Sequence, residues 1–293
     1  MGWSASSCGA TSDLLVIDGD TSPDSLPIPA EWATSDLAGL ASVPAADKAL
    51  RSGVPHAWLA RNAGTIRSHF ATEFWRRVNG PHGHVVLKLP SSMSSVAAAA
   101  LIGAWMGLRP DQIHGDIGGT VSHVVSGVGH RHDQSWHTDS TPWHEPNRYS
   151  VLGLLSGIGT EDQSTDLLAL SSLRQRLAAS DPAAWTALQT EPIEWRRNFP
   201  HLADLRAPVL APQQPRWVWP VLEALIDELS PELRRGVGLV ARLVNEVAYD
   251  SPVVTPSSVL VFDNGRMLHR GPHLEESSGR ELIRIKVAGK AIV

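Results

Sequence analysis

The sequence predicts a single domain, residues 1–293, of mixed α/β class. Its mainly β core is a barrel or sandwich, with helices packed outside. Strand-like runs occur at both ends of the second half of the chain, and helical stretches lie between them. A hydrophobic content of 42% in 293 residues is enough for one large core. No internal repeat, low-complexity tract or clean linker divides the chain.

Charge balance and cysteine content exclude several classes of protein. The chain has 25 Lys and Arg against 30 Asp and Glu, a formal net charge of -5, so we expect no basic surface for nucleic acid or an anionic membrane. The single cysteine, Cys8, cannot form an internal disulfide, and no apolar run approaches the roughly 20 residues of a membrane helix. We therefore expect a small-molecule partner and a reducing, cytoplasmic setting.

The first elements are predicted from composition and spacing. Residues 1–60 are rich in Pro, Ser and Ala and predict an irregular lead-in with one helix near residues 32–40. An amphipathic helix is expected over residues 66–78, because apolar residues such as Phe70 and Phe74 recur there at helical intervals before a glycine.

Short runs of β-branched and apolar residues, bounded by Gly, Asn or Pro, predict the strands of the core. These strands are residues 84–89, 120–125, 150–155, 257–262 and 281–287. Helical spacing of leucine or alanine predicts the remaining helices. These helices are an alanine-rich run through residue 105 and residues 166–178, 220–229 and 231–247.

Residues 162–220 are expected to be an insertion within the barrel that acts as a lid. The part from 192 to 220 carries six Pro, three Trp and four Arg without a regular period, which is typical of a functional loop. Trp195, Arg196 and Arg197 are the candidates for its substrate-facing part.

The candidate catalytic residues lie around two histidines. His137 and Asp139 are two residues apart, so on an extended segment over residues 136–141 both side chains project from the same face. His269 lies just past the strand of residues 257–262 and its Asp-Asn-Gly turn. Two imidazoles and a carboxylate can form a facial triad, which leaves coordination positions open and suits non-haem Fe(II).

Two arginines near the C-terminal end strengthen this prediction. Arg280 and Arg284 share one face of the alternating run at residues 281–287, and the other face of that run is apolar. A guanidinium beside a metal site suits a dicarboxylate co-substrate, because its planar fork can bind a carboxylate through two hydrogen bonds.

Three linked motifs resemble those of a known family. They are residues 136–141 (Trp-His-Thr-Asp-Ser-Thr), 259–269 (Val-Leu-Val-Phe-Asp-Asn-Gly-Arg-Met-Leu-His) and 280–284 (Arg-Glu-Leu-Ile-Arg). In this order they are similar to the taurine dioxygenase and clavaminate synthase-like group of Fe(II)/2-oxoglutarate oxygenases. The resemblance runs through residues 85–287.

The resemblance implies a distorted double-stranded β-helix, or jelly-roll barrel, with flanking and inserted helices. It also implies that His137, Asp139 and His269 bind Fe(II) and form the catalytic centre. Arg280 stands where the family binds the far carboxylate of 2-oxoglutarate, and Arg284 matches a position that faces the substrate or assists the same anion.

A hydroxyl side chain usually joins this arginine in the family. Thr165 matches it best, with Ser164 in reserve, although Asp162 and Gln163 stand where the family has Gly-Gly. Arg270 directly follows the second histidine, whereas the family often has an arginine one place later.

The activity that the resemblance implies is the hydroxylation of an unactivated C–H bond with O2, with release of succinate and CO2. The substrate is expected to be a small polar metabolite, either an amino acid or an intermediate of secondary metabolism. Retention of Asp139 favours hydroxylation, desaturation or ring closure over halogenation, because halogenating relatives have a small residue at this position. The candidates for substrate contact are Arg284, Trp143, Arg148, Trp195 and Arg196.

Other interpretations stay open on the sequence alone. A barrel of this kind could hold a ligand without turnover, or a zinc hydrolase could use the cluster from His130 to Asp139, in which His132 directly precedes Asp133. Arg284 could pair with an acidic neighbour, and Thr165 could be a plain helix cap. The tryptophans and arginines of the loops could serve in packing or lie in solvent.

Overall fold

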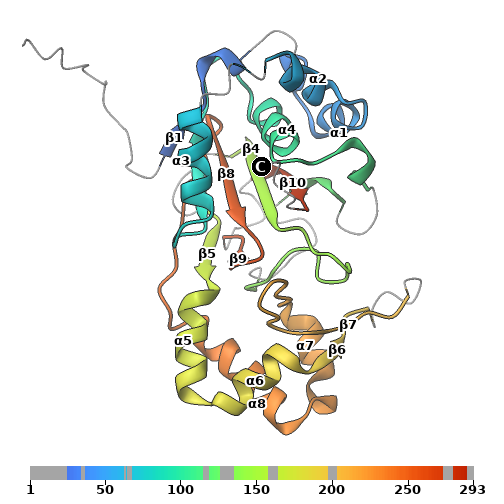
Figure 1. Ribbon diagram of the computed structural model, residues 1–293, viewed down its shortest axis with the longest axis vertical. Helices are drawn as coiled ribbons and strands as arrows, with labels where there is room; N and C mark the ends of the chain where they lie inside the picture. Colours follow the sequence, from blue (N-terminus) through green and yellow to red (C-terminus); the bar gives the residue numbers. More distant parts are fainter. Residues whose placement is uncertain are drawn as a thin grey trace, which may run out of the picture.

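The computed structural model describes residues 25–33, 37–62, 64, 68–114, 119–125, 135–157, 164–196, 203–272 and 280–288. Its central layer is a six-stranded sheet in the order β1-β2-β8-β4-β10-β3 (Figure 1). The strands are β1 (Ser25–Pro27), β2 (His84–Lys88), β3 (Val121–Val125), β4 (Tyr149–Ser156), β8 (Ser258–Asp263) and β10 (Glu281–Val287). All neighbours in this sheet are antiparallel except β1 and β2.

Two smaller ladders accompany the main sheet. β5 (Asp166–Ala169) pairs with β9 (Met267–Arg270), and β6 (Pro192–Glu194) pairs with β7 (Arg206–Pro208), both antiparallel. β5 and β9 are joined to each other and not to the main sheet, so the described strands do not close into a barrel. The fold is therefore mixed α/β with a large, mainly antiparallel sheet.

The central strands are covered on both faces, which explains their continuous apolar sequences. Every residue of β8 and the first six residues of β4 are buried. Alternate residues of β10 point to opposite faces of the sheet, as the sequence alternation predicts. Ile283, Ile285 and Val287 enter one core cluster, and Leu282 enters another cluster with Leu152 and Phe262.

Helices α1 (Val43–Arg51), α2 (Val54–Arg61), α3 (Ser68–Val78) and α4 (Ser95–Trp105) pack with one face of the sheet into a common core. α4 is buried along almost its whole length and lies directly on the sheet. A Cβ atom added at Gly153 of β4 would stand 3.0 Å from both the Ser95 carbonyl oxygen and Cγ2 of Ile283, so this close approach favours glycine.

A helical lobe lies at the opposite end of the molecule (Figure 1). It contains α5 (Leu170–Ser180), α6 (Pro182–Thr190), α7 (Trp219–Leu225) and α8 (Pro231–Leu243). These helices share a second core with Trp195 and Trp217, which are each 1% exposed. Between this lobe and the main sheet, the β5–β9 ladder adds Leu167 and Met267 to the third cluster.

The predicted elements agree with the structure in most places. α3, β2, α4, β3, β4, α7, α8, β8 and β10 all lie within the predicted ranges or extend from them by a residue or two. The helix predicted over residues 166–178 is partly wrong, because residues 166–169 form β5 and the helix begins only at Leu170. Pairing of Leu167 and Leu168 with β9 outweighs local helical spacing there.

The lead-in of residues 1–60 contains more helix than the sequence predicts. Near residues 32–40 the described residues hold only a short 3-10 helix, Ala30–Trp32, and a turn at residues 37–39, whereas residues 43–61 form α1 and α2. α1 begins where the Ser42 side chain accepts a hydrogen bond from the Ala45 amide at 3.4 Å, and proline stands in the first turn. The described parts of this segment, residues 25–33 and 37–60, therefore contribute to the packed core.

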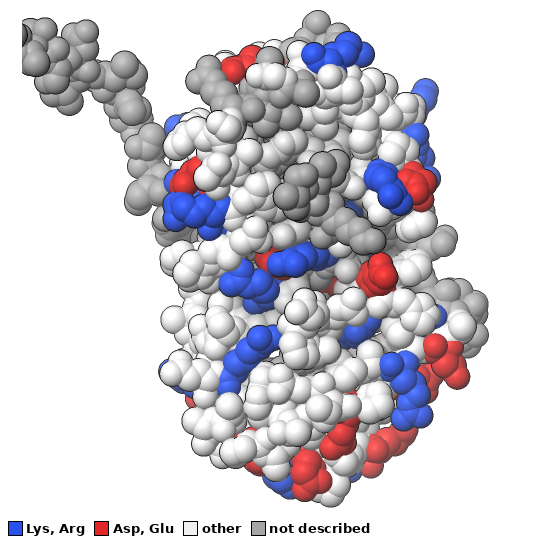
Figure 2. Space-filling model, viewed as in Figure 1, with Lys and Arg blue, Asp and Glu red and all other residues white. Residues whose placement is uncertain are grey.

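Basic and acidic side chains are interspersed over the face seen in Figure 2, and acidic side chains gather along the edge of the helical lobe. Among the described residues, no helix is both long enough and apolar enough to cross a membrane.

Candidate metal centre

The segment that carries the first histidine is held by backbone pairing, without a regular strand. The amide of His137 donates to the carbonyl of His269, and the amide of His269 donates to the carbonyl of His137, each at 2.9 Å. On its other side His137 forms a bridge with Val218. The chain then turns at Ser140, whose φ of 60° lies in the left-handed region. The extended segment predicted over residues 136–141 is therefore wrong beyond this bridge.

The side chains of His137, Asp139 and His269 converge as predicted. One potential ligand atom from each residue lies within 4.8 Å of the other two. The two imidazole centroids are 4.1 Å apart, and Nε2 of His269 is 3.8 Å from Oδ2 of Asp139. Directly opposed residues of an antiparallel pair project to the same side, so the backbone pairing of the two histidines brings their rings together.

Both histidines are neutral at physiological pH. Nδ1 of His137 lies 2.9 Å from the carbonyl oxygen of Ser135, so this nitrogen carries the proton and Nε2 offers a lone pair. Burial lowers the pKa of His137, and burial together with the neighbouring His137 ring lowers the pKa of His269 well below its usual value. Neutral imidazole is the form that binds a metal ion.

Asp139 is a buried carboxylate with a partner on each oxygen. Nη1 of Arg284 donates to Oδ1 at 2.8 Å, and Oγ of Ser150 donates to Oδ2 at 2.9 Å. Burial acts to raise the pKa of Asp139, but the positive charges of Arg284 and Lys286 outweigh it and hold the pKa far below its usual range. The cluster therefore presents two neutral imidazoles and one ionised carboxylate.

The turn between β8 and β9 braces the backbone at Asp139. Oδ1 of Asn264 accepts a hydrogen bond from the Asp139 amide at 2.8 Å, and its Nδ2 donates to the carbonyl of Asn147 at 2.8 Å. Asn147 in turn donates to Oγ of Ser150 at 3.0 Å. Sequence reasoning identified Asn264 only as part of a turn signal, and it missed this buried bracing role.

Arg280, which directly precedes β10, has a buried guanidinium group. It is 2% exposed, and one of its terminal nitrogens donates to Oγ1 of Thr165 at 3.0 Å. Its Nε has no hydrogen-bond partner, and no carboxylate among the described residues pairs with it. Burial lowers the pKa of Arg280 to about 10, still well above physiological pH. The structure thus brings Arg280 and Thr165 together, as predicted, and leaves the Nε–H group of Arg280 without an acceptor.

Two further arginines hold the loop that follows Asp139, and neither role is evident from the sequence. Arg216 is 2% exposed and donates to four carbonyl groups. These acceptors are the carbonyls of Thr141, Trp143, His144 and Gln214. Arg196 donates to the carbonyls of Pro142 and Ala203. Part of the insertion is therefore fastened to the loop after the metal-site motif.

The structure assigns different surroundings to the five candidate substrate residues. Arg284 pairs with Asp139, and Trp143 stacks on His114 at a centroid distance of 6.2 Å. Arg148 pairs with Asp263 at 3.2 Å and lines a separate cavity. The other two, Trp195 and Arg196, are engaged within the protein.

Trp195 packs in the second core and donates from Nε1 to the carbonyl of Ala207 at 2.9 Å. Arg196 donates hydrogen bonds to two backbone carbonyl groups. It is therefore not a solvated loop residue, and those donors are not free to bind a ligand. The structure therefore supports structural roles for these two side chains.

The remaining residues singled out by the sequence have mixed outcomes. Ser164 is buried beside Thr165. Arg270 binds Asp166 at 2.8 Å and lies 4.5 Å from the ring centroid of Trp136, so its charge is already engaged. Several positions of the predicted lid and of the alternative zinc cluster lie outside the described residues: His130, His132, Asp133, Asp162, Gln163 and Arg197.

No protein-family model and no curated protein sequence matches this chain. Solved structures match it in three dimensions. An asparagine oxygenase in complex with Fe(II), 2S,3S-3-hydroxyasparagine and succinate aligns with a TM-score of 0.59 over 90% of this chain and 93% of its own, at 17% sequence identity.

The non-haem iron oxygenase OrfP in complex with Fe and alpha-ketoglutaric acid aligns with a TM-score of 0.55 over 90% of this chain and 93% of its own, at 18% identity. The chain has the fold of non-haem iron oxygenases. The segment that carries His137 and Asp139 lies between two parts of the chain. On one side it pairs with Val218 of the insertion, and on the other it pairs with His269 and Asn264 of the β8–β9 region.

Proposed function

We propose that this protein is an Fe(II)- and 2-oxoglutarate-dependent oxygenase that hydroxylates a C–H bond of a small polar metabolite. The observation that carries the proposal is the convergence of two neutral histidines and an ionised aspartate, His137, His269 and Asp139. The fold, which matches iron oxygenases, supports the same function.

The donor set fits Fe(II). Two imidazole nitrogens and one carboxylate oxygen form a three-ligand site that leaves coordination positions for a co-substrate and O2. Two of the three residues are oriented by partners, since Ser135 fixes the tautomer of His137, and Arg284 and Ser150 hold Asp139. These three residues would bind the metal ion.

Arg280 and Thr165 fit one end of 2-oxoglutarate. A buried guanidinium without a carboxylate partner in the described part of the chain favours an anionic ligand, because an unpaired buried charge is costly. The planar fork can bind a carboxylate through two hydrogen bonds, and the Thr165 hydroxyl can supply a further one. Ser164 is the alternative hydroxyl at this position.

When bound, Fe(II) and 2-oxoglutarate supply the oxidising chemistry, in which O2 is consumed and succinate, CO2 and an oxidised substrate are released. The residues of this chain contribute binding and orientation. Arg284 and Asn264 keep Asp139 in place through its side chain and its amide. Arg216 fixes the following loop, which carries Trp143.

The proposed substrate class is a free amino acid or a related small polar molecule. The solved structures with this fold hold hydroxylated amino acids, 3-hydroxyasparagine in asparagine oxygenase and (3S)-hydroxy-L-Arg in OrfP. Of the predicted substrate residues, Arg284 contacts Asp139, and Trp143 lies in the loop that follows this residue. We retain these two as candidates for the substrate pocket.

Two finer predictions belong to the same proposal. We infer that the main sheet and the β5–β9 ladder are the two sheets of a distorted double-stranded β-helix, which the shared apolar cluster with Leu167, Phe262 and Met267 supports. The cytoplasmic setting rests on the single cysteine and stays a prediction.

The alternatives have less support. A ligand-binding barrel without turnover is expected to lose a metal ligand or the buried arginine, and this chain keeps all four residues. A zinc hydrolase based on residues 130–139 has no use for the buried Arg280.

The test is an anaerobic reconstitution with Fe(II), followed by addition of O2, 2-oxoglutarate and a panel of amino acids that includes asparagine and arginine. We expect succinate release that depends on 2-oxoglutarate and a product that contains one additional oxygen atom. His269→Ala should abolish metal binding and turnover together. His82→Ala, which removes an exposed histidine, should change neither. Metal binding and succinate release that survive His269→Ala would refute the proposal.

A further inference from the structure

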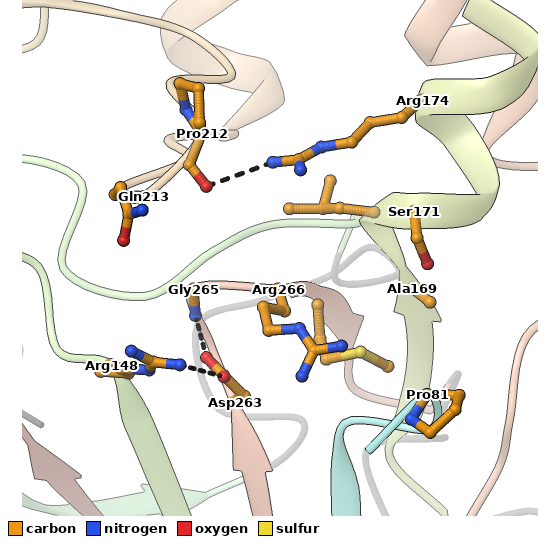
Figure 3. Close-up of a pocket in the computed structure, with 12 residues that line it drawn as sticks. Pro81, Arg148, Ala169, Ser171, Arg174, Pro212, Gln213, Asp263, Gly265 and Arg266 are labelled. Carbon is orange, nitrogen blue, oxygen red and sulfur yellow. Dashed lines mark hydrogen bonds and ion pairs between the residues drawn. The ribbon is translucent and has the colours of Figure 1, made fainter. Parts of the chain in front are cut away.

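A cavity lies beside the β8–β9 turn, outside the metal centre. Its volume is about 350 Å³, a size that suits a small ligand. It is lined by the residue before β4, the start of α5, the loop at residues 212–213 and the turn at residues 263–266 (Figure 3). Its lining residues do not include His137, Asp139 or His269 of the metal centre, and they do not include Arg280 or Thr165.

The charged side chains around this cavity are mainly basic. Arg148, Arg174 and Arg266 line it together with a single acid, Asp263, so three positive charges stand against one negative charge. Asp263 is completely buried, and both of its oxygens are engaged. Oδ2 accepts from Arg148 at 3.2 Å, and Oδ1 accepts from the Gly265 amide at 3.0 Å.

The other two arginines have neutral partners. Arg174 donates to the carbonyl of Pro212 at 3.3 Å, and Arg266 donates to the carbonyl of Asn79 at 2.7 Å. A carbonyl takes one hydrogen bond from a guanidinium but does not neutralise its charge, and each guanidinium has five N–H donors. Asp263, which already pairs with Arg148, also lies within the field of the Arg266 charge, so the three positive charges around the cavity share a single negative charge.

The three guanidinium groups approach from different elements. Arg174 reaches from α5 towards Pro212, Arg148 and Asp263 lie on the other side, and Arg266 lies between them (Figure 3). Ser171 adds a hydroxyl group to the lining near the start of α5. Donors from several directions suit a tetrahedral anion, whose oxygens point apart, better than a single planar carboxylate.

We propose that this cavity binds a phosphate group, either as inorganic phosphate or as the phosphoryl group of a small metabolite. Arg174 and Arg266 are its principal partners, because both donate to neutral carbonyl groups and not to the carboxylate of Asp263. Arg148 can donate a further hydrogen bond to the anion while it stays paired with Asp263. The site does not depend on bound iron or 2-oxoglutarate, since it shares no residue with the metal centre.

The cavity is also connected to the metal centre through one residue. Asp263 and Gly265 line the cavity, and Asn264 between them holds the amide of Asp139 at 2.8 Å. A ligand that changes the position of this turn would therefore change the bracing of a proposed metal ligand.

The experiment is calorimetric titration of the full chain with inorganic phosphate at low ionic strength, repeated with glycerol 3-phosphate. We expect saturable binding at one site, unchanged by saturating 2-oxoglutarate. Arg174→Gln and Arg266→Gln should each weaken it by about tenfold or more, the loss expected for a charge-assisted hydrogen bond. Comparable binding of glycerol 3-phosphate would identify a phosphorylated metabolite as the ligand class, and binding of phosphate alone would identify the free ion.

Arg176→Gln is the matched control, because Arg176 is an exposed arginine on the same helix and does not line the cavity. This variant should bind phosphate as the wild type does. The proposal is wrong if phosphate shows no saturable binding, or if Arg174→Gln and Arg176→Gln weaken it equally. Competition by 2-oxoglutarate, or loss of binding in Arg280→Gln with Arg174→Gln unaffected, would place the anion at the metal centre and also overturn the proposal.

Discussion

Nη1 of Arg284 donates a hydrogen bond to Oδ1 of Asp139 at 2.8 Å. Arg284 comes from β10, whereas Asp139 lies in the loop after the His137 bridge, so the contact joins segments that are far apart in the chain. It occupies Oδ1, while Oδ2 accepts a hydrogen bond from Ser150 and lies 3.8 Å from Nε2 of His269, on the side of the second histidine. The arginine therefore orients the carboxylate of a proposed metal ligand.

Arg284→Gln is expected to weaken Fe(II) binding. Two effects oppose each other, because loss of a nearby positive charge favours a divalent cation while loss of the hydrogen bond frees the carboxylate to rotate. Removal of a residue that orients a metal ligand typically costs about 10–100-fold in affinity, so we expect the loss of orientation to prevail. Anaerobic Fe(II) titration measures the change.

Arg284→Lys separates the two effects, because it keeps the charge but loses the planar fork. This variant should also bind Fe(II) more weakly than the wild type. Wild-type affinity in Arg284→Lys, or tighter binding in Arg284→Gln, would show that charge and not orientation is what Arg284 contributes.

Arg280→Lys should raise the concentration of 2-oxoglutarate needed for half-maximal succinate release by about tenfold or more, since the fork that can grip a carboxylate is lost. Arg270→Lys is the matched control, because the guanidinium of Arg270 is already held by Asp166 and Trp136. It should leave this concentration nearly unchanged. The opposite pattern would assign the co-substrate to Arg270.

Local sequence patterns could predict most strands and bring two of the candidate ligands onto one motif, because these features depend on short spacing. His137 and Asp139 form a recognisable motif, and the alternation of residues 281–287 is the alternation observed on β10. The helix predicted over residues 166–178 fails at its start because β5 gains a strand partner in β9, which lies about a hundred residues later. Such pairing cannot be derived from local spacing.

The bracing residues were beyond prediction for a related reason. Asn264 and Arg216 act through hydrogen bonds to backbone groups of residues 139–147, and a backbone carbonyl or amide has no signature in the sequence. Arg216 was counted among the arginines of a Pro-rich and Trp-rich segment and interpreted as part of a lid. In the structure it is one of the most buried charged residues.

Arg216→Met should lower the free energy of unfolding by about 2–4 kcal/mol, because four carbonyl groups lose their donor, one of them in a buried hydrogen bond and three in partly buried ones. Urea denaturation of the metal-free protein measures this loss. The control Arg206→Met removes an exposed arginine of β7 and should change stability by no more than about 0.5 kcal/mol. Equal losses in the two variants would contradict the bracing role of Arg216.

Lys286 gives a pH-dependent prediction. Burial lowers its pKa from 10.5 to about 8, even though Asp139 acts in the opposite direction. Between about pH 8 and 10.5 the unfolded chain therefore binds more protons than the folded chain, and stability rises with pH in that window. As the pH falls from about 10.5 to about 8 this contribution is lost, because the folded protein must then bury a charged ammonium group.

The measurement compares urea unfolding of the metal-free wild type and Lys286→Met across this window. The stability of the wild type relative to the variant should rise from pH 8 to pH 10.5. Lys48→Met, which removes an exposed lysine of α1, should show no such trend relative to the wild type. A difference between wild type and Lys286→Met that is independent of pH would contradict the lowered pKa.

The insertion at residues 162–220 leads to a prediction about motion. As a cover over the metal centre it should exclude water when substrate is bound, so amide hydrogens within residues 190–220 should gain protection from exchange. Parts of it are already fixed. The amide of Leu210 donates to Leu188 at 2.8 Å, and the amide of Trp217 donates to Oγ1 of Thr138 at 3.0 Å.

We therefore expect Leu210 and Trp217 to exchange slowly even without substrate, and any gain of protection to fall on other amides of residues 190–220. Hydrogen exchange of the anaerobic complex with Fe(II) and 2-oxoglutarate, with and without substrate, distinguishes the two groups of amides. Rapid exchange at Trp217 in the absence of substrate would contradict its bond to Thr138. Identical exchange in both states throughout residues 190–220 would show that the segment is static scaffold, because a cover that closes over the substrate must protect some of its own backbone.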